Sequence, residues 1–379
     1  MLGHPERHFP SVHVGGTNGK GSTCAFIAAA LEARGFRVGV YTSPHLVSVT
    51  ERVTVNGEPM GEDAFAEWTN RIAGDVERLD ASFFEATTAI AFADLAARGV
   101  DIAVIEVGLG GRLDSTNVIM PLVSVVTKIA LEHTDYLGPT LAGIAREKAG
   151  IAKRDVAFVT GEQDPQIRQV LVKEADARGA RPIVLVDTRR PPSPGVRLGL
   201  RGPHQWHNAW VALAALNALP APFGQEGEDI PASFADATIA GRFDIRGGGR
   251  WIFDVAHNPD GMDVLVAALR EERPARPLHA LVGIRNDKEW RPMLERLLPE
   301  VDRVVLTVGP TVPPAQRWVV EDLSGWTDER VIGQPVVFEP DFANAIELVQ
   351  EGAATVLVTG SFHTVGDAMA RLPAFAPYS

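Results

Sequence analysis

The sequence predicts an α/β protein of two domains, and two observations support this. Short apolar segments alternate with amphipathic or Ala-rich segments of helical length, which is typical of parallel strands joined by crossover helices. The alternation starts afresh near Gly241, after a segment at 220–231 that is rich in Pro, Gly and acidic residues. We therefore expect a larger α/β domain at 1–240 and a smaller one at 241–379.

The first domain is expected to begin with a strand that runs into a Gly-rich turn and a helix. Its predicted strands are 11–14, 37–41, 101–107, 122–129 and 156–160, and its predicted helices are 20–34, 84–98, 141–149 and 206–219. The first two helices end at Gly35 and Gly99. Glycine commonly follows a helix because it adopts the left-handed conformation without a steric cost.

The second domain repeats the same alternation on a smaller scale. Its predicted strands are 251–255, 278–282, 304–308 and 355–359, and its predicted helices are 261–271, 290–297 and 342–350. Ligand sites in such sheets lie beyond the carboxyl ends of the strands. We therefore expect the chemistry of both domains in the loops that follow strands.

Composition narrows the class of protein. A chain of 379 residues is too long for one ordinary core, and 45% hydrophobic with 22% charged residues is the balance of a globular enzyme. Its net charge of −12 disfavours nucleic-acid and anionic-membrane partners. The single cysteine, Cys24, excludes an internal disulfide, and the N-terminus lacks the apolar core of a signal peptide. We expect a cytoplasmic protein without membrane spans.

The segment VHVGGTNGKGST at 12–23 predicts a phosphate site. Gly15, Gly16 and Gly19 let backbone N–H groups face an anion, the helix N-terminus adds a favourable dipole, and Lys20 adds a cation. The general G-x-x-x-x-G-K-[ST] pattern is matched imperfectly, because Val14 takes the first Gly position and Gly21 separates Lys20 from Ser22. An ordinary Gly-rich turn is the simpler alternative, but the order of strand, turn, Lys and helix favours nucleotide phosphates.

Polar residues at other strand ends suggest a magnesium site. Glu106 ends a buried strand, where an unpaired carboxylate is costly, and we favour metal ligation over a simple ion pair. Ser43 follows the second strand and could complete the ligand set. A lone histidine is more often structural, but His133 follows a third neighbouring strand, which favours a functional role. Locally, Lys148 is typical of a solvated helix lysine.

The loop GLGGRLDSTN at 108–117 fails as a dinucleotide fingerprint, because Leu113 takes the position of the third glycine. Its glycines would allow the backbone to approach a flat or anionic ligand. Asp114 could then accept hydrogen bonds from an amino-heterocycle. It could equally well cap the segment that follows it, and the local sequence does not separate these two roles.

Together these segments resemble the folylpolyglutamate synthase/dihydrofolate synthase family, within the Mur ligase superfamily of ATP-dependent amide-forming ligases. The motifs lie in order along nearly the whole chain: GTNGKGS at 16–22, TSPHL at 42–46, FFEATT at 83–88, EVGLGGRLDSTN at 106–117, LEHTDYLGPT at 131–140, REKAGI at 146–151, GRF at 241–243, DVAHNPDG at 254–261, DK at 287–288 and GSFHTVGD at 360–367. The resemblance implies a P-loop ATPase domain followed by a Rossmann-like glutamate-ligase domain.

The resemblance also implies roles for individual residues. Lys20, Glu106, His133 and Lys148 are expected to be catalytic. Mg²⁺ is expected on Ser43, Glu106, His133 and Lys148, and Lys148 takes the position of a lysine that can be carbamylated in this family. ATP is expected on Thr17, Asn18, Gly19, Lys20, Gly21, Ser22, Asn208, Arg242 and Asp254. Pterin contacts are expected from Ser82, Phe83, Phe84, Glu85, Leu113, Asp114 and Ser115, and glutamate contacts from His257 and Ser361. Only 14 residues precede Gly15, fewer than in typical family members, so we expect one pterin contact to be absent or supplied differently.

The implied activity is the ATP-dependent addition of L-glutamate to dihydropteroate, to the terminal glutamate of folates, or to both, by a monomeric enzyme. The form of GGRLD, HTDYLG and GSFHTV favours an enzyme with both activities. The nearest alternative is a Mur-type ligase that acts on a UDP-muramoyl substrate. A GTPase is disfavoured because the sequence has no Asn-Lys dipeptide for an N-K-x-D motif, and a dehydrogenase is disfavoured by Leu113 and Lys20.

Overall fold

The computed structural model describes residues 2–191, 195–318, 321, 323, 336–375 and 377. The predicted α/β class is confirmed, because two mostly parallel sheets are each covered by helices. Contacts divide the chain into two compact units. The N-terminal unit comprises Met1–His45, Val49–Gly199 and Gln205–Thr238, and the C-terminal unit comprises Leu46–Ser48, Leu200–His204 and Ile239–Ser379.

The N-terminal sheet has the strand order β4-β3-β2-β5-β1-β6-β7-β8. The six strands from β2 to β8 in this order run parallel, and β3 and β4 continue the sheet antiparallel. The strands are β1 (Ser11–Gly15), β2 (Val38–Tyr41), β3 (Val53–Val55), β4 (Glu58–Pro59), β5 (Ile102–Glu106), β6 (Val123–Val126), β7 (Ala157–Thr160) and β8 (Ile183–Leu185). Because β1 and β5 are adjacent and parallel, the Gly-rich turn and Glu106 lie side by side at the carboxyl ends of these strands.

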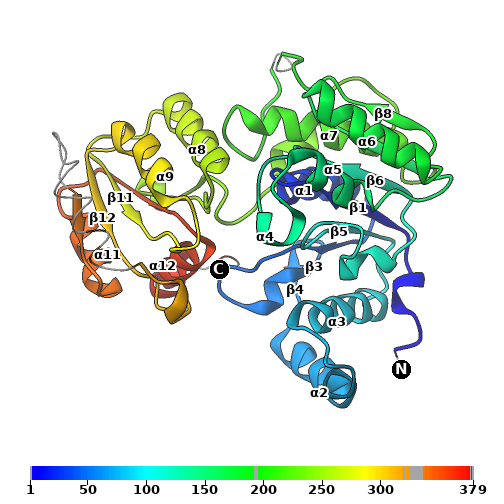
Figure 1. Cartoon of the computed structure of the whole chain (residues 1–379), viewed down its shortest axis with the longest axis horizontal. Coiled ribbons are helices and arrows are strands. Elements are labelled where there is room, and N and C mark those ends of the chain that lie inside the picture. The colour runs from blue at the N-terminus through cyan, green and yellow to red at the C-terminus, as the bar shows by residue number, and fades with distance from the viewer. Residues whose placement is uncertain are drawn as a thin grey trace. The chain divides into compact units, whose positions relative to one another are not determined.

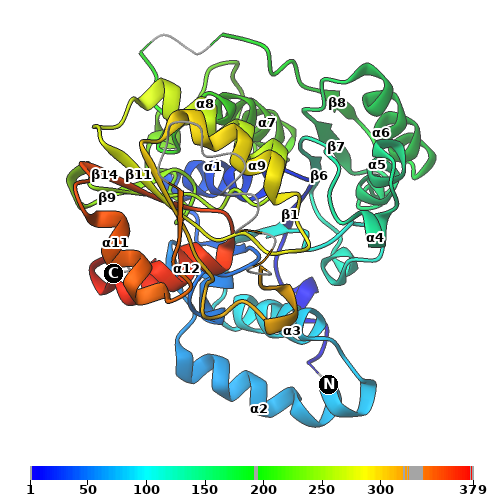
Figure 2. The same cartoon turned by 60° about the vertical axis from the view of Figure 1, so that its left-hand side comes forward.

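Helices cover both faces of this sheet. They are α1 (Lys20–Ala33), α2 (Glu62–Leu79), α3 (Phe83–Ala97), α4 (Thr134–Leu137), α5 (Leu141–Ala149), α6 (Pro165–Ala177) and α7 (His204–Ala218). Figure 1 shows α2 beside α3 and α5 beside α6, and Figure 2 shows both pairs from a second side. Ile105 packs with α2 and α3, while Phe158 packs with α5 and α6. Both side chains lie on one face, because they share a register row through His13 and Ser124.

The C-terminal sheet has the order β13-β12-β11-β14-β10-β9, with only β9 antiparallel. Its strands are β9 (Asp244–Arg246), β10 (Trp251–Phe253), β11 (Leu278–Val282), β12 (Arg303–Leu306), β13 (Val336–Phe338) and β14 (Thr355–Thr359). One hydrophobic cluster joins the sheet to α8 (Pro259–Glu272) and α9 (Trp290–Leu297), and the other joins it to α11 (Phe342–Gln350) and α12 (Phe362–Arg371).

Four of these helices, α2, α4, α6 and α12, are absent from the sequence-based expectation. The start of α6 carries a recognisable signal, because Asp164 accepts from the backbone N–H groups of Gln166 and Ile167, and Pro165 takes the first helical position. The start of α12 lies within GSFHTVGD, where the hydroxyl of Ser361 accepts from the backbone N–H of Thr364. The capping residue and the proline at the start of α6 are therefore a local signal that could have indicated this helix.

Within the part of the chain that the structure describes, every helix is too short or too polar to cross a bilayer.

The N-cap of α11 provides a stability test. Asp341 accepts a hydrogen bond of 2.9 Å from the backbone N–H of Asn344. Asp341→Ala should lower the free energy of unfolding by about 1 kcal/mol, because one helix donor loses its partner. Glu347→Ala, on an exposed turn of the same helix, removes the same charge and should change stability by less than about 0.5 kcal/mol. Urea denaturation compares the two variants, and equal effects would contradict the cap.

Candidate active site

The turn between β1 and α1 is built by glycines that other residues could not replace. Gly16 and Gly19 have φ angles of 134° and 90°, in the region that favours glycine. A Cβ atom on Gly16 would lie 1.9 Å from Oγ1 of Thr127, and one on Gly19 would lie 2.3 Å from Oδ1 of Asn208. The turn is therefore closely packed and leads directly into the N-terminus of α1, where an anion is stabilised.

Lys20, the first residue of α1, lies near the carboxylate of Glu106 at the end of β5. Its Nζ donates to the carbonyl of Thr17 at 3.0 Å and lies 4.0 Å from Oε1 of Glu106. The other carboxylate oxygen of Glu106 accepts from the backbone N–H of Ser43 at 3.3 Å. Because β1, β5 and β2 are adjacent and parallel, their ends bring a cation, a carboxylate and a Ser residue together.

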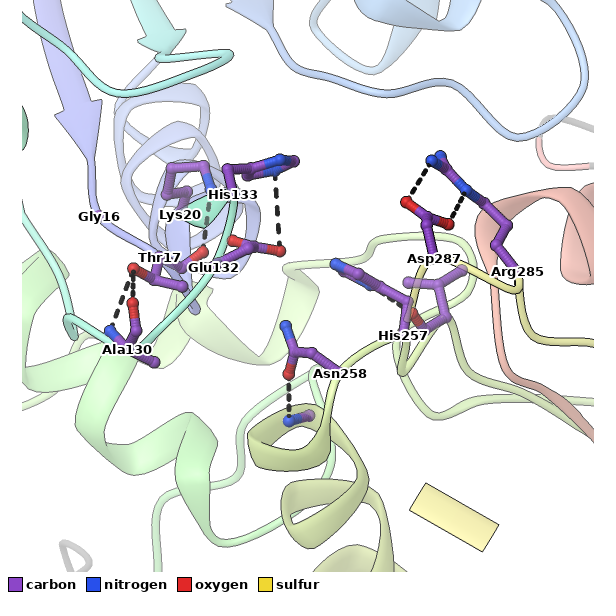
Figure 3. A network of polar contacts seen from close by, with 12 residues as sticks. Gly16, Thr17, Lys20, Ala130, Glu132, His133, His257, Asn258, Arg285 and Asp287 are labelled. Carbon is purple, nitrogen blue, oxygen red and sulfur yellow. Dashed lines mark hydrogen bonds and ion pairs between the residues drawn. The ribbon is translucent and has the colours of Figure 1, made fainter. Parts of the chain in front are cut away.

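His133 precedes α4 with a φ of 50°, and its Nε2 lies 3.9 Å from Oε1 of Glu132. Figure 3 shows these two side chains near Lys20 and Thr17. Glu132 was not predicted as a site residue, although its position beside His133 in LEHTDYLG could have indicated it. Among the residues that the structure describes, no three His, Cys, Asp or Glu side chains gather as a metal-binding group.

Lys148 is buried, so the local interpretation as a solvated helix lysine is wrong. It is only 5% exposed, and its Nζ donates to the carbonyl of Gly16 at 2.7 Å. Burial and, to a smaller extent, the charge of Lys20 lower the pKa of Lys148 to about 7, while Glu132 and Asp114 act in the opposite direction. A neutral amine is therefore accessible near neutral pH, in contact with the Gly-rich turn at residues 15–19, which we call the phosphate loop.

The loop after β5 is held by Asp114. Its Oδ2 accepts from the backbone N–H of Leu109 at 2.7 Å, and its Oδ1 accepts from that of Thr116 at 3.0 Å. The carboxylate thus caps the short helix Ser115–Val118, the second of the two roles that the sequence leaves open. Leu113, in the same loop, is 79% exposed.

The segment 82–85 begins α3. Ser82 and Glu85 form a capping box, in which the Ser82 hydroxyl accepts from the N–H of Glu85 and the Glu85 carboxylate accepts from the N–H of Ser82. Phe84 lies against Gly108, whereas the ring of Phe83 is 60% exposed with the guanidinium of Arg52 5.3 Å from its centroid. The segment therefore presents one aromatic face to solvent.

Asn208, on α7, is buried against the phosphate loop. Its Nδ2 donates to Oε1 of Gln205 at 2.9 Å, and its Oδ1 faces Gly19. Asn208 and Gly19 are both predicted to bind ATP. They are far apart in sequence, and the packing of α7 brings them together.

In the C-terminal unit, Asp254 follows β10 and accepts from the backbone N–H groups of Phe243 and Ala256, each at 2.9 Å. Burial raises the pKa of Asp254, and the charge of Arg242 opposes this shift. The guanidinium of Arg242 lies 5.2 Å from the ring centroid of Phe362, and the ring of His257 lies 5.5 Å from the same centroid. The ring of Phe362 therefore lies close to two predicted site residues, Arg242 and His257, although Phe362 was not itself predicted as a site residue.

Two further polar residues of this unit act as helix caps. Ser361 accepts from the backbone N–H of Thr364 at 3.1 Å at the start of α12, and its hydroxyl donates to the carbonyl of Gly283 at 2.8 Å. Asn258, labelled beside His257 in Figure 3, accepts from the backbone N–H of Gly261 at 2.7 Å. Ser361 is buried by these contacts.

Comparison with known proteins defines the class of enzyme. The description "Mur ligase middle domain" matches residues 14–190, and "Mur ligase, glutamate ligase domain" matches residues 241–362. These matches define an ATP-dependent ligase that forms an amide bond.

The relatives define the family. The dihydrofolate synthase/folylpolyglutamate synthase of Mycobacterium tuberculosis is 37% identical, with 81% of this chain and 72% of the relative covered, and that of Bacillus subtilis is 31% identical, with 98% and 92% covered. The solved structure of Escherichia coli FolC in complex with DHPP and ADP is 34% identical, with a TM-score of 0.83 over 98% of this chain and 91% of that chain.

A second solved structure carries a metal ion. The bifunctional enzyme of Yersinia pestis, complexed with AMPPNP and Mn ion, is 32% identical, with a TM-score of 0.82 over 98% of this chain and 90% of that chain. The protein belongs to the dihydrofolate synthase/folylpolyglutamate synthase family, which consists of ATP-dependent glutamate ligases. The UDP-muramoyl alternative is not favoured.

Lys20 and Glu106 allow a direct test of this site. Lys20→Ala and Glu106→Ala should each lower glutamate-dependent ADP release by at least about 100-fold, because charge stabilisation near the phosphates is lost. Lys173→Ala, on the exposed side of α6, should retain the wild-type rate. The measurement is ADP release, with circular dichroism to show that each variant is folded. Near-normal turnover in either site variant would contradict the assignment.

Proposed function

We propose that the protein joins L-glutamate to dihydropteroate, to the terminal glutamate of folates, or to both, through an acyl phosphate. The observation that carries this proposal is the convergence of the phosphate loop, Lys20 and Glu106 at adjacent strand ends. The complexes of the relatives with ADP, AMPPNP and DHPP support ATP and a pterin compound as substrates.

In the first proposed step, a carboxylate oxygen of the acceptor attacks the γ-phosphorus of ATP, and ADP leaves. In the second, the neutral amine of glutamate attacks the acyl carbon, phosphate leaves, and the amine loses a proton. The barrier is mainly electrostatic, because a carboxylate must approach a triphosphate. Lys20 and the N-terminus of α1 neutralise part of this charge.

The donor chemistry at the strand ends fits a hard divalent cation. Ser43, Glu106 and His133, with Lys148 as a carbamate, would hold Mg²⁺, which prefers oxygen ligands and would supply further neutralisation of phosphate charge. The Mn ion in the Yersinia pestis relative supports a divalent metal. As a carbamate, Lys148 would add the carboxylate-like oxygens that an amine lacks.

The two domains would divide the binding of substrates. Residues 1–240 would bind ATP through Thr17, Asn18, Gly19, Lys20, Gly21, Ser22 and Asn208, and the pterin acceptor through Ser82, Phe83, Phe84, Glu85, Leu113, Asp114 and Ser115. The exposed faces of Phe83 and Leu113 suit a flat heterocycle. Residues 241–379 would add Arg242 and Asp254 for ATP, and His257 and Ser361 for glutamate.

The enzyme is proposed to be a cytoplasmic monomer that does not bind nucleic acid or membranes. Its net charge of −12 opposes polyanion binding. Cys24 is a free, buried thiol, which is compatible with a reducing compartment.

A comparison of acceptors tests the proposed reaction. With ATP and L-glutamate present, dihydropteroate and tetrahydrofolate should each stimulate ADP release, and mass spectrometry should show products heavier by one glutamyl group. UDP-muramoyl substrates serve as the control and should give no stimulation. Stimulation by the UDP-muramoyl compounds alone would overturn the proposal, and stimulation by only one of the folate acceptors would restrict the enzyme to that activity.

The lowered pKa of Lys148 provides a test of carbamylation. The neutral amine adds to CO₂ to form a carbamate and releases a proton, so carbamylation should increase as the pH rises from about 6 to about 8, through the pKa of about 7. Carbon-13 NMR after labelling with ¹³C-bicarbonate should show a carbamate signal that Lys148→Met lacks and Lys173→Met keeps. A spectrum at pH 8 identical to that of Lys148→Met would exclude carbamylation.

A further inference from the structure

A chain of buried hydrogen bonds links β1 to the loop after β5. Nε2 of His13 lies 2.8 Å from Oγ1 of Thr116, and Oγ1 of Thr116 donates to Oδ1 of Asp114 at 2.5 Å. His13 and Thr116 are fully buried, and Asp114 is nearly so. The three residues come from two segments about a hundred positions apart, so the chain is a product of the tertiary fold.

The donor and the acceptor in each of these hydrogen bonds follow from which groups carry protons. A carboxylate can only accept, so the Thr116 hydroxyl gives its proton to Asp114 and must accept from His13. Burial lowers the pKa of His13 to about 3, so the ring is neutral and carries one N–H, on Nε2. Its Nδ1 is buried without a hydrogen-bond partner, as expected for the bare nitrogen of this tautomer.

The same loop is also tied to the phosphate site. Asp114 holds the N–H of Leu109, and the N–H of Arg112 donates to the carbonyl of Glu147 at 2.9 Å. Lys148, the next residue, donates to the carbonyl of Gly16. His13 lies two residues before Gly15, where the phosphate loop begins. The loop 108–116 is thus connected to β1 through Asp114, Thr116 and His13. It is connected to the turn after β1 through Glu147 and Lys148.

We propose that His13 and Thr116 are positioning residues that fix the position of Asp114 and of the loop 108–116 relative to the phosphate loop. The proposal rests on the proposed function, in which this loop contacts the acceptor whose carboxylate receives the phosphate. A misplaced loop would weaken productive binding of the acceptor but leave ATP in its own loop.

The residues that form these hydrogen bonds allow matched variants for a test. Thr116→Val keeps the side-chain shape but removes the two hydrogen bonds of the hydroxyl, with His13 and with Asp114. Thr116→Ser retains the hydroxyl. His13→Leu removes the donor, whereas His13→Gln retains an N–H that can reach Thr116. Ser124→Ala is the control, because Ser124 is a buried β6 residue of the same sheet row whose hydroxyl donates to the carbonyl of Ile151 instead.

Thr116→Val and His13→Leu should lower kcat/KM for the folate acceptor by about 10-fold or more, because the first removes a buried hydrogen bond to Asp114 and the second leaves the Thr116 hydroxyl without its donor. KM for ATP should stay within about twofold of wild type. Thr116→Ser, His13→Gln and Ser124→Ala should remain near wild type in both parameters. Equal increases of KM for ATP and for the acceptor, or no rescue by Ser and Gln, would overturn the proposal.

Hydrogen exchange supplies a readout that does not depend on activity. Thr116→Val should accelerate exchange of the backbone amides of Leu109 and of position 116, with no change at residues 20–24 of α1. Unchanged exchange at Leu109 would overturn the proposal, even if activity falls. If the wild-type protein uses no folate acceptor, the proposed function fails while the exchange experiment still decides the role of the chain. If Thr116→Val does not fold, the His13→Leu and His13→Gln pair tests the same link.

Discussion

The close packing of the phosphate loop is the constraint on which the rest of the N-terminal site depends. Gly16 and Gly19 leave no room for a side chain beside Thr127 and Asn208, so the residue that follows β6 and a residue of α7 restrict the path of the loop. Lys20 follows at the start of α1, and the carbonyl of Gly16 receives the buried amine of Lys148. A displaced loop would therefore disturb the helix N-terminus, both lysines and the contact with Glu106 together.

Local charges work against the charge of the whole molecule. At −12 the protein repels anions at a distance, yet the substrates of the proposed reaction are all anions. Salt screens the long-range field beyond ~8–10 Å, whereas groups within the site act at a few ångströms. In the proposed reaction, Lys20 and the amide groups at the start of α1 would act on the phosphates of ATP within that range, and would favour anions that the charge of the whole molecule repels.

Each unit has a buried or half-buried carboxylate next to a strand end that accepts hydrogen bonds from the backbone. Glu106 ends β5 and accepts from Ser43, while Asp254 follows β10 and accepts from Phe243 and Ala256. Burying such groups is unfavourable unless they are hydrogen-bonded or paired with a cation. Their retention at the carboxyl ends of parallel strands, where α/β proteins bind ligands, agrees with a functional role.

Local sequence was sufficient for the fold class, because alternating apolar periodicity and glycine stops determine strands and helices over short ranges; the helices 141–149 and 290–297 have the predicted bounds. It also predicted that Lys20, Ser43 and Glu106 lie close together, because the ends of adjacent parallel strands meet. Tertiary structure alone decided the rest. Lys148 is buried although its helix segment looks solvated, and Asp114, Thr116 and His13 form one chain across about a hundred residues. Burial and long-range hydrogen bonds depend on which segments pack together, and no local pattern encodes that.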